Sequence, residues 1–202
     1  MDFDSIRSAL AGAVRQLAGA CGVNLYRFAA DRRVLERVIL PHLAHGHEFA
    51  RVLFVGCAWY TQHYAQLFES KEFWTLELDP TRQKFGAKRH IVDSLENLSL
   101  HFSPDSLDAI VCNGLLGWGL NDKQLIERAF GACVDCLRPG GVFVLGWDDV
   151  ELRRPCPPQE CASLQRMKPH VFEPLSTTQY VTKTASRHTY DFFEKANNAS
   201  GQ

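Results

Sequence analysis

The sequence lacks an excess of basic residues. Its 202 residues include 22 Lys and Arg against 23 Asp and Glu, which gives a formal net charge of -1, and the cations are scattered along the chain. Proteins that follow a phosphate backbone concentrate Lys and Arg in a patch or stripe. The composition therefore argues against a nucleic-acid partner.

Long apolar runs are also lacking. No run approaches the roughly 18 to 20 residues that are needed to span a bilayer. The N-terminal sequence MDFDSIRSAL has acids where a signal peptide needs a basic region. We therefore expect a cytoplasmic protein with no membrane partner, and the 46% hydrophobic content suits one globular domain of ordinary size.

The cysteines do not form a recognisable framework. Seven is an odd number for a set of disulfides. Cys133 and Cys136 have CxxC spacing but lie inside a helical pattern, and the other close pair, Cys156 and Cys161, has a different spacing. We expect buried, reduced thiols and no metal site.

Helical and strand patterns occupy different parts of the chain. Residues 4–20 and 31–46 have apolar residues at helical spacing, with Pro41 as an expected kink or break. From Arg51 onward, short β-rich runs alternate with helical runs, as in βαβ units on a parallel sheet. We expect an N-terminal helical segment over residues 1–48, which packs on a core domain over residues 49–195, and a disordered tail over residues 196–202.

The expected fold is α/β, with a doubly wound, mostly parallel sheet and helices on both faces. Two of the strands are nearly continuous hydrophobic runs, as in sheets that are covered on both sides. Two C-terminal runs rich in β-branched and aromatic residues predict a final antiparallel pair. The predicted strands cover residues 51–56, 73–79, 89–93, 107–113, 140–147, 178–185 and 186–195; residues 122–137 and 161–167 predict helices.

The loop after the first strand has few glycines. In the sequence RVLFVGCAWYTQHY, residues 51–64, Gly56 ends the strand, but Ala58, Trp59 and Tyr60 stand where further glycines would be expected. A helix that begins near Tyr60 would offer its N-terminal amides to a carboxylate or phosphate. A pyrophosphate needs a glycine-rich turn in order to lie against the backbone, so this loop disfavours NAD.

Polar residues follow the strands at the edge where doubly wound sheets bind ligands. Glu77 ends the second strand about twenty residues after Gly56, the distance at which an acid commonly binds ribose hydroxyls. Asp79 is the less favoured alternative, because a proline follows it where a helix starts. Asp93 and Asn113 end the third and fourth strands.

In their order and spacing these residues resemble the class I S-adenosylmethionine-dependent methyltransferases, whose sheet is Rossmann-like and seven-stranded. The resemblance covers about residues 51–194. It departs from the family at Phe54, where the family has an acid, and at Ala58 and Tyr60, where it has glycines. The segments that carry it are Gly56 after an apolar strand, the acid of ELDP, then DSLENL, PDSLDAIVCNGLL and LRPGGVFVLGW.

The resemblance implies a site for S-adenosylmethionine. The loop from Gly56 to Tyr60 would face the methionine part, Glu77 would bind the ribose hydroxyls, and Asn113 would line the pocket. Asp93 would lie at the adenine with its two successors, although a turn residue explains it equally well. The implied cofactor-binding residues are Gly56, Cys57, Ala58, Tyr60, Glu77, Asp93, Ser94, Leu95 and Asn113.

Further candidates concern the methyl acceptor. Trp118 and Trp147 follow strands at the same edge and are candidates for a substrate pocket, with core packing as the competing interpretation. If the acceptor must lose a proton, Asp148, Asp149 and His63 are weak candidates for the base. For His63, packing of the first helix against the sheet is the favoured role.

The predicted function is methyl transfer from S-adenosylmethionine to a small-molecule acceptor. Asn113 is followed by Gly-Leu-Leu, whereas methyltransferases of adenine or glutamine nitrogen typically have Pro-Pro and an aromatic residue there. Two alternatives remain. The first is a catalytically idle methyltransferase-like binding or partner protein. The second, less favoured, is an NAD-binding oxidoreductase.

Overall fold

The computed structural model of the chain describes residue 14 and residues 29–196. Apart from residue 14, the helix predicted over residues 4–20 lies outside these residues, as does nearly all of the predicted tail. The division at residue 48 stays a prediction. The elements are α2 (Ala30–Val34), η2 (Leu35–Ile39), α3 (Leu40–His45), β1 (Arg51–Val55), α4 (Tyr64–Leu67), β2 (Glu72–Glu77), η3 (Pro80–Phe85), β3 (Arg89–Val92), η4 (Leu95–Leu100), β4 (Leu107–Asn113), α5 (Lys123–Cys136), β5 (Leu137–Asp148), η5 (Glu151–Arg153), η6 (Pro158–Glu160), η7 (Leu164–Arg166), β6 (Met167–Pro169), η8 (Glu173–Leu175), β7 (Gln179–Val181) and β8 (His188–Lys195).

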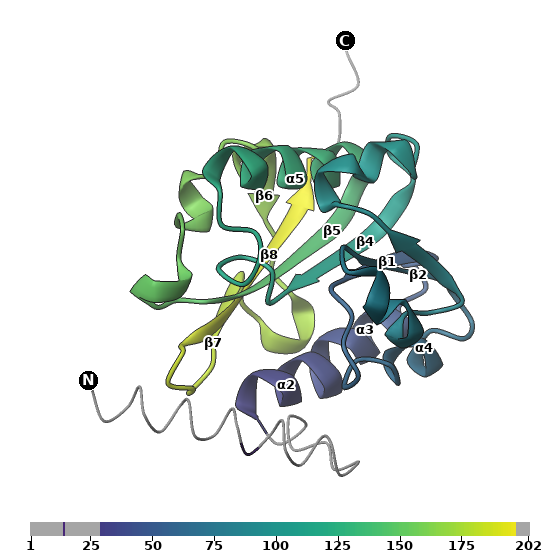
Figure 1. Ribbon diagram of the computed structural model, residues 1–202, viewed down its shortest axis with the longest axis horizontal. Helices are drawn as coiled ribbons and strands as arrows, with labels where there is room; N and C mark the ends of the chain where they lie inside the picture. The colour runs from purple at the N-terminus through teal and green to yellow at the C-terminus, as the bar shows by residue number, and fades with distance from the viewer. Residues whose placement is uncertain (1–13, 15–28, 197–202) are drawn as a thin grey trace.

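The strands form one sheet in the order β3-β2-β1-β4-β5-β8-β6, and β7 also pairs with β8 (Figure 1). Strands β1 to β5 are parallel, whereas β8 runs antiparallel to β5, β6 and β7. This confirms the predicted doubly wound sheet with an antiparallel C-terminal strand. The strand order reverses between β1 and β4, and the crevice at such a reversal is where these sheets bind ligands.

Apolar side chains form a separate core on each face of the sheet. Successive residues of β1, β4 and β5 point to opposite faces, so these strands are hydrophobic throughout. Helix α5 covers one face, and α2 to α3 cover the other (Figure 1). The α5 side includes Leu53, Val55, Ile110, Cys112, Phe143 and Leu145, and the α3 side includes Val52, Phe54, Ala109, Val111, Val142 and Val144.

The predicted kink at Pro41 takes the form of a π-helical turn. Residues 30–45 are helical without a break, and the π-helical segment η2 lies directly before Pro41, the second residue of α3. Proline has no N–H and its ring crowds the preceding turn, so a wider turn accommodates it.

Among the described residues, no helix is long and apolar enough to cross a membrane.

Helix α5 matches its prediction. The Asp122 side chain accepts a hydrogen bond from the Leu125 N–H at 2.8 Å and caps the helix. Cys133 and Cys136 are buried on its inner face, as expected. Burial raises the pKa of the Cys136 thiol to about 11, so this thiol stays protonated at neutral pH.

Four segments differ from their predictions. Of the strand predicted over residues 178–185, only β7 (Gln179–Val181) forms. The strand predicted from residue 140 begins at Leu137 directly after α5, with a register irregularity opposite Leu107 to Ala109. The helix predicted to begin near Tyr60 begins at Tyr64, after consecutive turns. Residues 161–167 contain only a three-residue 3-10 helix and lead into β6, a strand too short to give a pattern in the sequence.

The Asp108 carboxylate joins β4 to the start of β1. Its Oδ2 accepts hydrogen bonds from the backbone N–H groups of Ala50 and Arg51, at 2.9 and 2.6 Å. Its Oδ1 accepts from Arg138, whose guanidinium also donates to the Glu48 carbonyl. Three donors around one carboxylate fix the amino end of the central strands.

We predict that Asp108→Ala lowers the free energy of unfolding by about 2 to 3 kcal/mol, because it leaves two backbone donors and a guanidinium without their acceptor. Urea unfolding followed by circular dichroism measures the change. Asp135→Ala is the matched control, since that carboxylate pairs with Arg166 at an exposed site and should contribute less than about 1 kcal/mol. Equal stability losses in both variants contradict the prediction.

Candidate functional site

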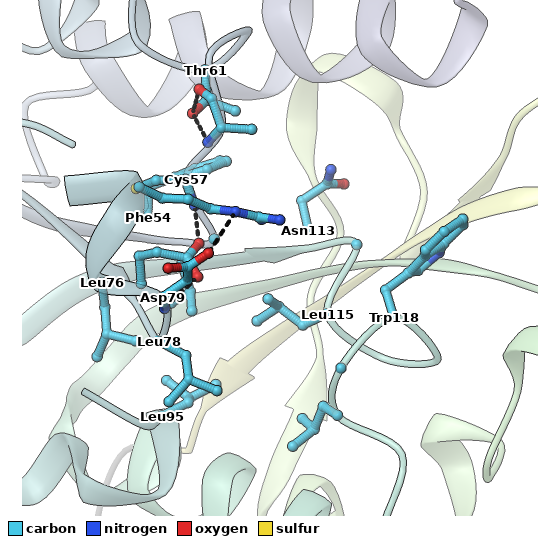
Figure 2. A pocket seen from close by; sticks show the side chains of 18 of the residues that line it. Phe54, Cys57, Thr61, Leu76, Leu78, Asp79, Leu95, Asn113, Leu115 and Trp118 are labelled. Atoms are coloured by element: carbon cyan, nitrogen blue, oxygen red, sulfur yellow. Dashed lines mark hydrogen bonds and ion pairs between the residues drawn. The ribbon is translucent and has the colours of Figure 1, made fainter. Parts of the chain in front are cut away.

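A cavity of about 340 Å³ opens at the carboxyl ends of the parallel strands. Figure 2 shows Cys57, Asp79 and Leu95 on one side of it, and Leu115 and Trp118 on the other. It brings together all nine residues that the resemblance assigns to the cofactor, and one of the two tryptophans. These residues are Gly56, Cys57, Ala58, Tyr60, Glu77, Asp93, Ser94, Leu95, Asn113 and Trp118.

Gly56 is required at the end of β1. Its φ is +91°, a conformation that other residues rarely adopt, and an added Cβ would lie 3.2 Å from the Leu115 side chain. Its N–H donates to the Leu76 carbonyl at 2.9 Å, so the backbone remains tied to β2 as the chain leaves the sheet. The glycine lets the loop turn over the sheet edge beside the cavity.

The Glu77 carboxylate holds this loop in place. Its Oε2 accepts a hydrogen bond from the Cys57 N–H at 2.7 Å, and its Oε1 accepts from the Asp79 N–H at 3.0 Å. Glu77 is only 8% exposed, and it lines the cavity. Each carboxylate oxygen has a second lone pair, so the group can still accept hydrogen bonds from a ligand.

The rest of the loop satisfies its own donors. The Ala58 N–H donates to Thr61 Oγ1 at 3.0 Å, and the Thr61 hydroxyl donates to the Ala58 carbonyl at 2.9 Å.

Burial, with a smaller contribution from the Glu77 charge, raises the pKa of the Cys57 thiol to about 11. The thiol is therefore neutral at physiological pH, and the Cys57 backbone rather than its sulfur defines the site.

Asp93 borders the cavity, but its own loop engages both carboxylate oxygens. Oδ1 accepts hydrogen bonds from the Asn97 amide and the Ser94 N–H, and Oδ2 lies 2.7 Å from His101 Nε2. Hydrogen bonds from Asn97, His101 and Ser94 hold the pKa of Asp93 below its usual value. The structure thus gives Asp93 the turn role that the sequence left open, and contact with adenine remains a prediction.

Tyr60 forms part of the cavity wall, while His63 does not. The Arg32 guanidinium lies 4.5 Å from the centroid of the Tyr60 ring. His63 lies beside a second, shallower hollow with Trp59, and its ring contacts Tyr64 edge-on. His63 is exposed at this position, which is outside the main cavity, so the packing role favoured for it stays a prediction.

Asp148 belongs to a buried network behind the cavity. Its Oδ1 lies 2.7 Å from His188 Nδ1, and its Oδ2 accepts from the Trp118 indole N–H at 3.0 Å. His188 Nε2 lies 3.1 Å from Asn113 Oδ1, so the His188 ring links Asp148 to the end of β4. Burial opposes ionisation of Asp148, but hydrogen bonds from His188 and Trp118 hold its pKa below the usual value.

Trp118 and the loop after β5 are locked together. The Arg153 guanidinium lies 3.6 Å from the centroid of the Trp118 ring and donates to the Gly117 carbonyl. A Cβ on Gly117, whose φ is +80°, would lie 1.9 Å from the Arg153 carbonyl oxygen. The loop after β4, which lines the cavity through Trp118, is therefore packed against the loop after β5.

Two candidates lie away from the cavity. Trp147 is not a cavity residue: it continues β5, its ring is buried on the α5 side of the sheet, and its indole donates to Asp191 at 2.6 Å. Asp149 forms ion pairs with Arg154 and Arg187. Core packing, the competing interpretation of Trp147, is the one that its burial supports.

Sequence reasoning missed several residues of the site. Arg32 reaches the cavity from α2, and Leu78 and Arg82 line it beside Glu77. His188 supports it from β8. No motif marks Arg32 or His188, because each is brought to the site by the packing of a segment that is distant along the chain.

Comparison with known proteins gives matches only among solved structures. No family model and no curated protein matches the chain. The N-methyltransferase NodS from Bradyrhizobium japonicum, solved with S-adenosylhomocysteine, superposes with a TM-score of 0.59 at 18% identity, over 83% of this chain and 88% of that one. The chain has the class I methyltransferase fold.

Two further structures agree. A TehB-like S-adenosylmethionine-dependent methyltransferase from Corynebacterium glutamicum has a TM-score of 0.59 at 17% identity, over 95% of this chain and 99% of that one. The 1,6-didemethyltoxoflavin-N1-methyltransferase from Burkholderia thailandensis, solved with its acceptor and S-adenosylhomocysteine, has a TM-score of 0.57 at 15% identity, over 98% and 92%. At these identities the matches establish the fold alone.

We predict that Gly146→Ala disturbs the site. An added Cβ would lie 2.1 Å from Asn113 Oδ1 and 2.9 Å from the Tyr190 ring, so the Asn113 amide must move and stability should fall by about 1 to 3 kcal/mol. Gly131→Ala is the control, because that helical glycine has nothing within 4 Å of the added Cβ. Urea unfolding checks both, and an unchanged Gly146→Ala protein contradicts the prediction.

The lowered pKa of Asp148 predicts an acid-dependent loss of stability. A carboxyl with a lower pKa in the folded state stabilises the fold above its unfolded value of about 3.9, and this stabilisation disappears as the pH falls through the folded value. The thermal midpoint of Asp148→Asn should therefore depend less on pH than that of the parent between about pH 2.5 and 5. Scanning calorimetry across this range measures both slopes, and equal slopes exclude the assignment.

Proposed function

We propose that this protein is an S-adenosylmethionine-dependent methyltransferase that acts on a small molecule. The observation that carries the proposal is the cavity at the strand-order reversal, into which Gly56, Glu77 and Asn113 converge. A site in this position is the general ligand site of doubly wound sheets. Its volume is within the range of about 300 to 1,000 Å³ that is typical of small-molecule sites.

The residues present fit the cofactor. Glu77 presents a buried carboxylate whose orientation is fixed by two backbone N–H groups, as a ribose diol requires. Leu78 lines the cavity with its side chain 68% exposed, and Leu95 lies in the same wall. An exposed leucine beside a cavity offers apolar surface to a flat base. In this assignment Glu77 holds the ribose, Leu78 and Leu95 contact the adenine, and the Gly56 to Tyr60 loop borders the methionine part.

The chemistry places modest demands on the chain. Bound S-adenosylmethionine supplies an electrophilic methyl group on a sulfonium. The protein must hold a nucleophile in line with that group and keep water away. Asn113 and Trp118 line the cavity, where they can orient an acceptor. Asp148 acts through Trp118 as a positioning residue, since its oxygens are occupied by His188 and the indole.

A small acceptor is favoured by the composition of the walls. Tyr60, Trp118 and Leu120 supply aromatic and apolar surface, and Asn113 supplies a polar group, the mixture that is typical of small-molecule pockets. A neighbour of the same fold was solved with bound 1,6-didemethyltoxoflavin, a small molecule. The balanced charge of the chain gives a nucleic acid no cationic track.

The loop geometry disfavours the oxidoreductase alternative. The Cys57 and Ala58 N–H groups donate to Glu77 and Thr61, so they are not available to a pyrophosphate.

A catalytically idle relative would keep the same cavity, and only a binding and turnover experiment separates it from an enzyme. Calorimetric titration with S-adenosylmethionine, S-adenosylhomocysteine and NAD should give micromolar binding of the first two alone. Binding of NAD alone contradicts the proposal, and cofactor binding with no methyl transfer in an acceptor screen favours the idle alternative.

We predict that Glu77→Gln weakens S-adenosylhomocysteine binding by at least about tenfold, or about 1.4 kcal/mol. The substitution removes the charge that strengthens the ribose hydrogen bonds and leaves one loop N–H facing an amide NH₂. Glu69→Gln is the control, since Glu69 is exposed between α4 and β2. Titration calorimetry measures both affinities, and parental affinity in Glu77→Gln removes Glu77 from the site.

A further inference from the structure

Arg32 is a buried cation in the wall of the cavity. It is 9% exposed and comes from α2, outside the segment that resembles the methyltransferase family. Its Nη1 donates to the Tyr64 hydroxyl at 3.1 Å, and its guanidinium lies over the Tyr60 ring. Neither partner is a carboxylate, so neither forms an ion pair with the guanidinium.

Among the described residues the guanidinium forms no ion pair with a carboxylate, and the charge of Asp31, its neighbour in α2, favours the protonated form from beyond ion-pair distance. The other cavity arginine, Arg82, forms such a pair: its Nε lies 3.5 Å from Asp79 Oδ2. Arginine stays protonated at any physiological pH, and a buried charge without a counterion is costly. An arginine in this situation is poised to receive an anion from the cavity.

The surroundings hold Arg32 in a fixed position. The Tyr64 hydroxyl accepts from Arg32 and donates to Glu36 Oε1 at 2.8 Å, so one tyrosine links two residues of the helical segment. Burial raises the pKa of Tyr64, which keeps this hydroxyl protonated and able to donate. Glu36 is thereby engaged through the tyrosine and does not pair with the guanidinium directly.

We propose that Arg32 binds a carboxylate at the end of the cavity beside the Gly56 to Tyr60 loop. The planar guanidinium matches a carboxylate through paired N–H donors, and only its Nη1 has a hydrogen-bond acceptor among the described residues. The inference rests on the proposed function, which offers two sources of the carboxylate. One is the amino-acid end of the cofactor, and the other is an acid group on the acceptor.

Two adenosyl ligands, one with and one without a carboxylate, distinguish the two sources of the carboxylate. S-adenosylhomocysteine carries the carboxylate, whereas 5′-methylthioadenosine keeps the adenosine and sulfur but has no amino-acid end. If the carboxylate is the cofactor's, Arg32→Gln should weaken S-adenosylhomocysteine binding by at least about tenfold and leave methylthioadenosine binding unchanged. Arg33→Gln is the matched control, because it makes the same change at the next, exposed position of α2.

If the carboxylate belongs to the acceptor, Arg32→Gln should bind both adenosyl ligands like the parent. Transfer of a labelled methyl group is then compared across aromatic carboxylic acids that carry a separate hydroxyl or amino group as the nucleophile, each beside its own methyl ester. Aromatic compounds suit the Tyr60 and Trp118 walls. The parent should prefer the acids, and Arg32→Gln should lose this preference.

Other outcomes overturn the inference. If Arg32→Gln has the parent's affinity for both adenosyl ligands and the parent's preference between acids and esters, Arg32 does not bind an anion in the cavity. Equal losses for S-adenosylhomocysteine and methylthioadenosine show a damaged site rather than a lost carboxylate contact. Arg32→Lys keeps the charge in case Arg32→Gln fails to fold, and it should show the same ligand selectivity with a smaller loss. A parent protein that binds neither adenosyl ligand overturns the proposed function itself, a result distinct from all of these.

Discussion

The site depends on one carboxylate, that of Glu77, which joins the ends of two neighbouring parallel strands. By accepting from the Cys57 and Asp79 N–H groups, it fixes the chain as it leaves β1 and as it leaves β2. Thr61 satisfies the next donor, that of Ala58. The loop therefore needs a glycine only where φ is positive, at Gly56. Side-chain acceptors replace the open glycine turn, and this is why Ala58 and Tyr60 are compatible with the fold.

A second polar network supports the opposite wall. Asp148 ends β5 and His188 begins β8, and the antiparallel pairing of these strands places the two residues opposite one another. Through Trp118 and Asn113 the pair reaches both the loop after β4 and the end of β4. The antiparallel C-terminal strand thus contributes to the cavity without lining it, and the cavity walls are held from both sides of the strand-order reversal.

The sequence predicts the elements whose apolar residues repeat with the period of a strand or a helix. The central strands were correct because helices cover both faces, which makes the strands apolar throughout. The spacing of Glu77 after Gly56 predicts its place at the cavity, because adjacent parallel strands end at the same edge of the sheet. Trp118 and Trp147 looked equivalent in the sequence, yet β5 extends through Trp147 and turns its ring into the α5 core. Arg32 could not be found, since only tertiary packing brings its helix to the cavity and no local pattern records that contact.

The close contact between Gly117 and Arg153 couples the two connections that follow β4 and β5. The Arg153 carbonyl fills the space that a side chain at residue 117 would take, and its guanidinium stacks on Trp118. The connection after β4 and the connection after β5 consequently cannot move independently. A change at Gly117 or Arg153 therefore alters the Trp118 wall of the cavity, although Arg153 itself does not line it.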